Sequence, residues 1–211
     1  MRRSLNPDKG DRAPESDVFV RGVFLKLEAG KDFLKAQRIK HSRGPGGSRF
    51  MERGMAAKPF IDLSTLDLTK IQFTREQVYA HLPHRYEFMQ VDGIVHYDRE
   101  KRMGVGLKIV REDEFWVKGH IPDRPLFPGV LMIETAAQMA AFLSHQDTPD
   151  ERFMGFGGVD HVRFRGTVVP PSTMYFLLKV VEIKPRRTIA DAQGIVDGKL
   201  VFEGRFIGMP I

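Results

Sequence analysis

The segment from residue 119 to residue 138, G-H-I-P-D-R-P-L-F-P-G-V-L-M-I-E-T-A-A-Q, places the strongest constraint on the fold. Its prolines keep residues 121–127 out of regular structure, and Pro128 suits the first turn of a helix because its fixed φ matches that position. Residues 130–143 are apolar or small on almost every face, a pattern typical of a helix surrounded by protein. At about 14 residues this helix is too short to span a bilayer. The segment therefore predicts a buried central helix that follows an irregular loop.

Two polar side chains interrupt the expected helix. Glu134 and Gln138 are four residues apart and share one face. Since a buried carboxylate costs several kcal/mol unless a partner compensates it, a carboxylate on this helix indicates chemistry. The nearest candidate partner is His120, directly before the proline-rich loop, and histidine is the side-chain type whose unperturbed pKa lies near neutrality. His120 and Glu134 are therefore the candidate catalytic pair.

This segment resembles the active-site signature of 3-hydroxyacyl-[acyl-carrier-protein] dehydratases of the FabZ type. That signature has a His in a G-H-x-P turn, then P-G-V, then Glu and Gln on the central helix. A second segment agrees, because residues 82–86 (L-P-H-R-Y) with Val91 and Asp92 are similar to the opening of the same family. The likeness covers about residues 71–207. It implies the hotdog fold, an α+β arrangement in which a curved antiparallel sheet wraps around one long central helix.

Local patterns predict the elements around that helix. Thr74 and Gln77 have the spacing of a capping box, so a short helix is expected over residues 75–81, and Pro83 ends it. Asp197 and Gly198 form a strong hairpin signal. Strands are expected over residues 91–97, 103–110, 114–118, 152–165, 173–183, 188–196 and 199–206. One apolar helix among several antiparallel strands predicts the α+β class, in agreement with the resemblance.

The N-terminal part of the chain differs in composition from the rest. The first 58 residues carry 14 Lys and Arg against 7 Asp and Glu, so the whole basic excess of the chain lies there. Their Gly and Pro content is typical of a flexible segment, although apolar side chains within residues 17–39 favour a short strand and a helix. We therefore expect a basic, flexible extension over residues 1–69 and a hotdog dehydratase domain over residues 70–211.

Composition also excludes several classes of function. No aromatic side chains alternate with the basic residues of the extension, so no nucleic-acid partner is expected. The absence of Cys excludes a disulfide framework and thiol catalysis. No apolar run reaches the length of a membrane span, and the N-terminus lacks the apolar stretch of a secretory signal. The expected location is the cytoplasm, with no membrane contact.

The resemblance implies a role for each candidate site residue. His120 would remove the proton at C2 of the acyl chain, and Glu134, with its pKa raised by apolar surroundings, would deliver a proton to the departing hydroxyl. The N–H groups of Gly129 and Val130, at the start of the helix, would stabilise the thioester oxygen. Gln138 would bind substrate or hydrogen-bond buried groups, an alternative left open. No metal or redox cofactor is expected.

The chain departs from the family signature in places. Ile121 replaces the usual aromatic residue of the G-H-F-P turn, and Trp116 with Val117 stands where a Phe pair is usual. His84 and Arg85 are expected to dock their segment by hydrogen bonds rather than to act on substrate. None of these departures removes His120 or Glu134, so they leave acyl length and carrier docking open and the reaction unchanged.

Two other functions are open to a chain of this kind. One is a hotdog acyl-thioester hydrolase, and the other is a non-catalytic acyl-binding subunit. The loop His followed 14 residues later by a helix Glu favours the dehydratase of fatty-acid synthesis. The resemblance implies acyl carrier protein as the partner that brings substrate. It also implies a homodimer, or a trimer of dimers, in which His comes from one subunit and Glu from the other.

Overall fold

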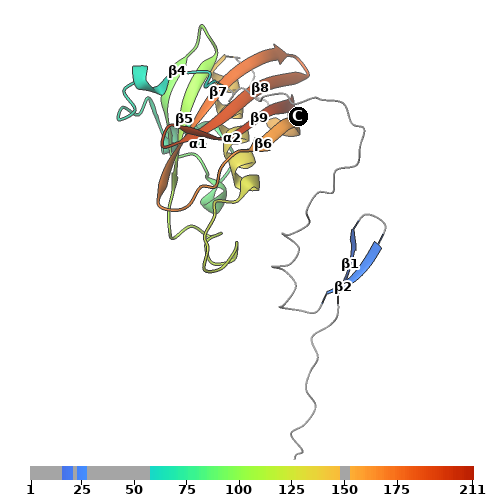
Figure 1. Ribbon diagram of the computed structural model, residues 1–211. Coiled ribbons are helices and arrows are strands. Elements are labelled where there is room, and N and C mark those ends of the chain that lie inside the picture. Colours follow the sequence, from blue (N-terminus) through green and yellow to red (C-terminus); the bar gives the residue numbers. More distant parts are fainter. Residues whose placement is uncertain (1–15, 21–22, 28–57, 148–152) are drawn as a thin grey trace, which may run out of the picture. The chain divides into compact units, whose positions relative to one another are not determined.

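The computed structural model describes residues 16–20, 23–27, 58–147 and 153–211. The chain divides into two compact units, Met1–Arg53 and Gly54–Ile211. In the first unit, β1 (Ser16–Val20) pairs antiparallel with β2 (Val23–Leu27) (Figure 1). The strand predicted in this stretch is therefore present as half of a hairpin. The helix predicted after it lies outside the described residues.

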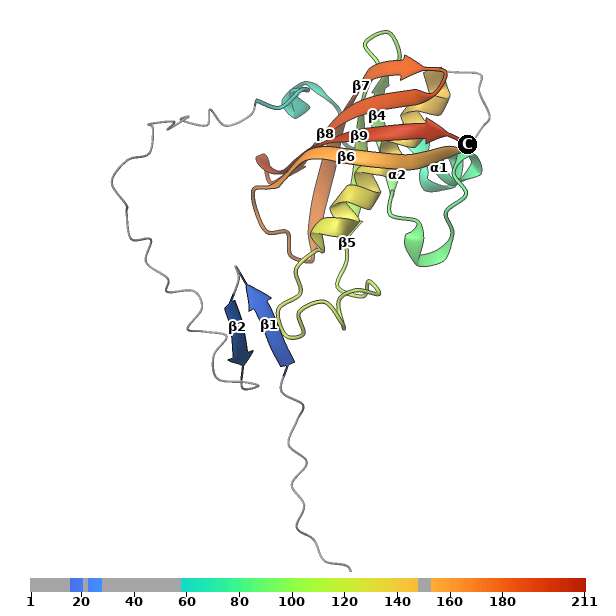
Figure 2. The ribbon, with the colours of Figure 1, turned by 90° about the vertical axis from the view of Figure 1, so that its right-hand side faces the viewer.

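The second unit is an antiparallel sheet of seven strands that curves around one long helix, α2 (Gly129–Asp147) (Figure 2). The strands follow the spatial order β3-β4-β5-β7-β8-β9-β6. Their bounds are β3 (Phe73–Thr74), β4 (Gly93–Asp98), β5 (Met103–Val110), β6 (Met154–Phe164), β7 (Ser172–Lys184), β8 (Arg187–Val196) and β9 (Lys199–Pro210). This arrangement confirms the predicted hotdog fold. No helix in the described part of the chain is long and apolar enough to cross a membrane.

The short helix α1 (Arg75–His81) precedes β4 and begins with the predicted capping box. The Thr74 hydroxyl accepts from the Gln77 N–H at 3.4 Å, and the Gln77 side-chain oxygen accepts from the Thr74 N–H at 2.8 Å. These two bonds satisfy two N–H groups that the first turn of a helix leaves without partners. The helix ends before Pro83, as predicted. A single 3-10 turn, η3 (Tyr86–Phe88), then leads toward β4.

Helix α2 packs closely against β5, and two glycines make this possible. A Cβ atom at Gly106 would lie 2.2 Å from the sulfur of Met139, and one at Gly104 would lie 2.8 Å from a methyl carbon of Leu143. Both distances are shorter than real Cβ atoms tolerate, so a larger residue at either position would force these buried side chains of α2 to move. These glycines let the side chains of α2 approach the backbone of β5 closely.

The hairpin between β8 and β9 has the predicted turn. Asp197 and Gly198 have φ values of 49° and 72°. Positive φ at both central residues is the requirement of a type I′ turn, whose twist matches that of the flanking strands, and Asp-Gly meets this requirement at low cost. The turn sets the register of the two strands that form one wall of the cavity described below.

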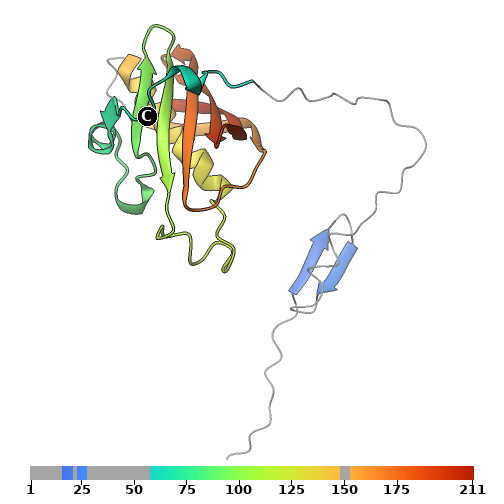
Figure 3. The same cartoon turned by 60° about the vertical axis from the view of Figure 1, so that its left-hand side comes forward.

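The predicted strand over residues 114–118 is wrong, because these residues form turns in the long connection from β5 to α2 (Figure 3). The Val117 N–H donates to the Glu114 carbonyl at 3.0 Å, and the His120 N–H donates to the Trp116 carbonyl at 2.7 Å. The backbone groups that a strand would offer to a neighbouring strand are therefore used locally. Of the apolar side chains that predicted a strand, Trp116 and Val117 instead pack into the core and anchor the loop, whereas Phe115 is exposed.

A short segment before α1 covers the outer face of the sheet. The Phe60 N–H donates to the side-chain oxygen of Gln193 at 2.8 Å. Leu63, Leu66 and Leu68 pack against a second apolar cluster, which is formed by Val95, Val105, Leu177 and Ile195. Residues from Lys58 onward therefore contact the sheet, although composition alone placed them with the extension.

Candidate active site

Glu134 and Gln138 lie on one face of α2, as their spacing predicts. Gln138 is almost fully buried, and its side-chain nitrogen donates to the Glu134 carboxylate and to the Phe88 carbonyl, both at 2.7 Å. Its oxygen accepts from the Tyr79 hydroxyl at 2.6 Å and from the Gln90 N–H at 3.3 Å. Because these partners come from α1 and the segment after it, Gln138 holds one orientation and fixes the carboxylate beside it.

Tyr79 extends this network toward β4. Its hydroxyl donates to Gln138 and accepts from the Val91 N–H at 2.7 Å. Burial raises the pKa of Tyr79 above its ordinary value, so its hydroxyl stays protonated and remains a donor. Of the two roles left open for Gln138, the hydrogen bonding of buried groups is therefore the one seen here, and substrate binding stays a prediction.

The second partner of Glu134 is His84. The His84 Nε2 atom lies 3.4 Å from the Glu134 carboxylate, and about a quarter of each side chain is exposed. The hydrogen bond from His84 lowers the pKa of Glu134, burial opposes this, and the bond from Gln138 lowers it further. The prediction that apolar surroundings raise the pKa of Glu134 is therefore wrong for this chain, because two donors outweigh partial burial. The sequence predicts only a docking role for His84, and its contact with Glu134 is seen only in the structure.

Glu134 and His84 open onto a largely apolar cavity of about 100 Å³. One wall is α2, which contributes Ala137, Ala140 and Ala141, and the opposite wall comes from β6, β8 and β9. The sheet side is lined by Met154, Phe156, Ala190, Phe206 and Ile207, among others. A cavity with apolar walls and a carboxylate at one end suits a ligand with a hydrocarbon part and one polar reacting group.

His120 lies elsewhere in the chain. It is exposed on the loop after β5, and its backbone N–H is held by the Trp116 carbonyl. Ile121 and Asp123 have φ values of 57° and 66°, so the loop turns sharply directly after the histidine. Within the described residues, no hydrogen bond or ion pair joins His120 to Glu134, and His120 is absent from the lining of the cavity. A single chain therefore does not bring the candidate catalytic pair together.

Gly129 and Val130 form the start of α2, as predicted. The first helical bonds run from Leu131 and Met132 to the Pro128 carbonyl, at 2.9 and 3.2 Å. The N–H groups of Gly129 and Val130 precede these bonds and point out of the helix end, where the helix dipole favours negative charge. Val130 is 71% exposed. Their role toward a thioester oxygen stays a prediction.

Comparison with known proteins agrees with this geometry. The family described as FabA-like domain matches residues 82–205, which include both sequence motifs and the strands from β4 to most of β9. The chain is 38% identical over 138 residues to the 3-hydroxyacyl-[acyl-carrier-protein] dehydratase FabZ of Tolumonas auensis, covering 62% of this chain and 89% of that protein. It is 39% identical over 133 residues to the FabZ of Aromatoleum aromaticum, covering 60% and 90%.

A solved structure supports the fold. The dehydratase heterocomplex ApeI:P from Xenorhabdus doucetiae aligns with a TM-score of 0.53 and 15% identity over 64% of this chain and 90% of that chain. At this identity, the likeness concerns the fold alone. The family match carries the classification, since it spans more than half of the chain and the FabZ relatives align over most of their length. The chain belongs to the FabA-like family of hotdog dehydratases.

Proposed function

We propose that this protein dehydrates 3-hydroxyacyl thioesters of acyl carrier protein to trans-2-enoyl thioesters in fatty-acid synthesis. The observation that carries the proposal is the carboxylate of Glu134, held by two side chains at the end of an apolar cavity in a chain of this family. The substrate and its carrier follow from the names of the FabZ relatives. The apolar cavity supports the acyl part of this substrate.

The proposed reaction removes a proton from C2 and hydroxide from C3, so the substrate loses the elements of one water. The His120 imidazole takes the C2 proton, and the electron pair of that C–H bond forms the new double bond as the C3–O bond breaks. The N–H groups of Gly129 and Val130 stabilise the charge that develops on the thioester oxygen. Glu134 protonates the departing hydroxyl. The proton that His120 gains equals the proton that Glu134 loses, and exchange with solvent restores both groups, so the reaction needs no redox partner.

The lowered pKa of Glu134 sets a condition on this scheme. A carboxylate that accepts hydrogen bonds from His84 and Gln138 is ionised at neutral pH, and it must gain a proton before it acts as an acid. A substrate hydroxyl that displaces either donor would remove part of what lowers the pKa. Loss of one donor would move the pKa of Glu134 back toward its ordinary value, which is the direction that the reaction requires.

The proposal includes a homodimer in which each site takes His120 from one chain and Glu134 from the other. Its support is the sheet edge formed by β6, which pairs with β9 alone among the described strands. Phe156 and Phe164 on this edge strand are 56% and 52% exposed. An open edge with exposed aromatic side chains fits association with a second copy. A two-fold axis would then repeat the site twice, and a trimer of dimers remains the larger assembly proposed.

The activity test uses the full chain with 3-hydroxybutyryl and crotonyl thioesters of acyl carrier protein. Enoyl absorbance and free thiol are followed separately. We expect interconversion of the two thioesters without thiol release. Release of free thiol would identify a hydrolase instead, and binding without either change would identify a non-catalytic acyl-binding subunit.

We expect the extension to be dispensable for turnover. A chain beginning at Met55 keeps the segment from Lys58 onward that packs on the sheet, so kcat/KM should stay within about threefold of the full chain. A chain beginning at Ile71 is the control, since it loses that packing and should unfold at a lower temperature. A large loss of kcat/KM in the Met55 chain at an unchanged melting temperature would contradict the division of the chain into an extension and a catalytic domain.

A further inference from the structure

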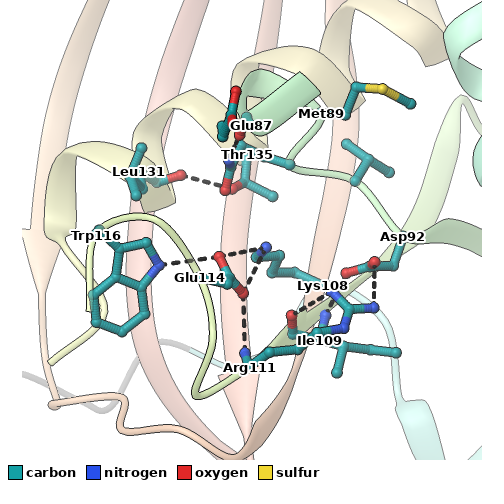
Figure 4. Close-up of polar contacts among 12 residues, drawn as sticks. Glu87, Met89, Asp92, Lys108, Ile109, Arg111, Glu114, Trp116, Leu131 and Thr135 are labelled. Carbon is teal, nitrogen blue, oxygen red and sulfur yellow. Dashed lines mark hydrogen bonds and ion pairs between the residues drawn. The ribbon is translucent and has the colours of Figure 1, made fainter. Parts of the chain in front are cut away.

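A buried ion pair under the His120 loop has no part in the proposed reaction. Lys108 lies on β5 and is 3% exposed, and its ammonium group is 3.0 Å from the carboxylate of Glu114, on the loop (Figure 4). Burying two charges is costly, and an ion pair of this kind is often replaceable by apolar side chains without loss of stability. Stability alone therefore does not account for the pair.

The Glu114 carboxylate ties the loop to the sheet. Besides Lys108, it accepts from the Trp116 indole N–H and from the Arg111 backbone N–H, both at 3.0 Å. The Arg111 guanidinium in turn bonds Asp92 at 2.8 Å, next to β4 (Figure 4). One carboxylate thus joins three donors from the strand, from the start of the loop and from its middle.

Trp116 connects this carboxylate to the histidine. Its carbonyl accepts the N–H of Gly119 at 3.2 Å and that of His120 at 2.7 Å. Its ring is buried against Phe127, with ring centroids 5.6 Å apart, and the Lys108 ammonium lies 5.8 Å from the Phe127 ring centre. The same cluster therefore holds the loop before and after His120. A continuous set of contacts runs from Lys108 through Glu114 and Trp116 to the backbone of His120.

We propose that Lys108 and Glu114 are positioning residues, which hold the Trp116 indole and thereby set where the backbone of His120 lies. This inference rests on the proposed function, in which His120 is the base. The hydrogen bond from the Trp116 indole is a feature of this chain, because the Phe that the family signature usually has at this position carries no N–H. A base misplaced by about 1 Å loses on the order of 100-fold in rate. Contacts that hold His120 in position therefore affect kcat.

Single substitutions alone do not separate positioning from folding. Lys108→Met or Glu114→Gln leaves its partner buried with reduced compensation, which lowers stability whatever the pair does for catalysis. The double variant Lys108→Met/Glu114→Gln removes both charges at nearly constant volume and avoids this penalty. Its melting temperature should lie closer to that of the wild type than either single variant does.

The experiment compares the full-length wild type with Lys108→Met, Glu114→Gln, the double variant and Trp116→Phe. We expect the double variant to lose about 10-fold or more in kcat, with KM within about threefold, while its stability recovers. Amide hydrogen exchange of residues 114–120, measured without substrate, should be faster in every variant of the pair. Trp116→Phe, which keeps the ring and loses only the indole N–H, should lower kcat in the same direction.

A matched control is the ion pair of Asp191 and Arg205, which joins β8 to β9 without contact to the loop. Asp191→Asn/Arg205→Met should leave both kcat and the exchange of residues 114–120 unchanged. A double variant of Lys108 and Glu114 that regains wild-type kcat together with its stability would overturn the inference.

An inactive wild type would refute the proposed function. Two measurements that do not depend on turnover would still test whether Lys108 and Glu114 hold the loop. Trp116 is the single tryptophan of the chain and is buried, so its emission should shift to longer wavelength if the loop loosens in Lys108→Met. Unchanged emission together with unchanged exchange of residues 114–120 would show that Lys108 and Glu114 do not hold the loop.

Discussion

Glu134→Gln is expected to lower kcat by two decades or more, about the scale on which a positioned acid or base contributes. The substitution keeps the volume and an oxygen that accepts from neighbouring donors, but it removes the group that delivers the proton. The assay is enoyl formation from the 3-hydroxybutyryl carrier thioester. Glu100→Gln, at an exposed position in the turn between β4 and β5, is the matched control and should retain full activity.

The same variant tests the electrostatics of the site through stability. The pKa of Glu134 is lower in the folded chain than in the unfolded chain, so its carboxylate stabilises the fold above about pH 4.3, the ordinary value for Glu, and this contribution is lost as the pH falls through the lowered pKa. Glu134→Gln should therefore be slightly less stable than the wild type at pH 7 and should approach it at pH 3. Normal turnover in Glu134→Gln would refute its role as the acid.

Mixed dimers of His120→Ala and Glu134→Ala are expected to regain activity that neither variant has alone. If each site takes one residue from each chain, a mixed dimer has one site that lacks both groups and one that keeps both. Random pairing makes about half of the dimers mixed, so about a quarter of all sites should be intact. The expectation follows from the separation of His120 and Glu134 within one chain.

The measurement co-expresses the two variants with different affinity tags and isolates the mixed species by sequential purification. The isolated mixed dimers should reach about half of the wild-type kcat per dimer, while each variant alone stays at background. Both variants combined on one chain, paired with wild type, provide the control. If each site takes residues from both chains, neither site of this dimer is intact. If each site lies within one chain, the site of the wild-type chain stays intact. Mixed dimers that form but remain inactive would place the two residues in one chain or outside the reaction.

Elements whose determinants are local were predictable from sequence. The capping box of Thr74 and Gln77, the start of α2 after Pro128 and the Asp197-Gly198 turn each depend on backbone preferences within a few residues. The family motifs added the hotdog fold, which composition and periodicity had narrowed only to the α+β class. Glu134 and Gln138 share a face because helical spacing alone requires it.

The predictions that were wrong concern side chains whose partners lie in other segments of the chain. The segment 114–118 (E-F-W-V-K) has an apolar centre of strand-forming residues, but whether a strand forms depends on a neighbour to pair with, and here Glu114 instead forms an ion pair with Lys108. The pKa of Glu134 depends on His84, 50 residues earlier, which no spacing rule connects to it. The sequence indicates that a buried carboxylate is energetically unfavourable, but only the three-dimensional structure shows which hydrogen-bond donors stabilise it.

The two sides of α2 differ in how much change they tolerate. On the side of β5, Gly104 and Gly106 leave no room between helix and strand. On the side of β6, β8 and β9, the helix presents Ala137 and Ala141 to an open cavity. A larger residue at either alanine would extend into unoccupied space and shorten it, whereas a larger residue at either glycine would collide with the buried side chain of Met139 or Leu143. If the cavity takes the acyl chain, as proposed, single substitutions on the cavity side of α2 would change the chain length that is accepted and leave the packing of α2 on β5 intact.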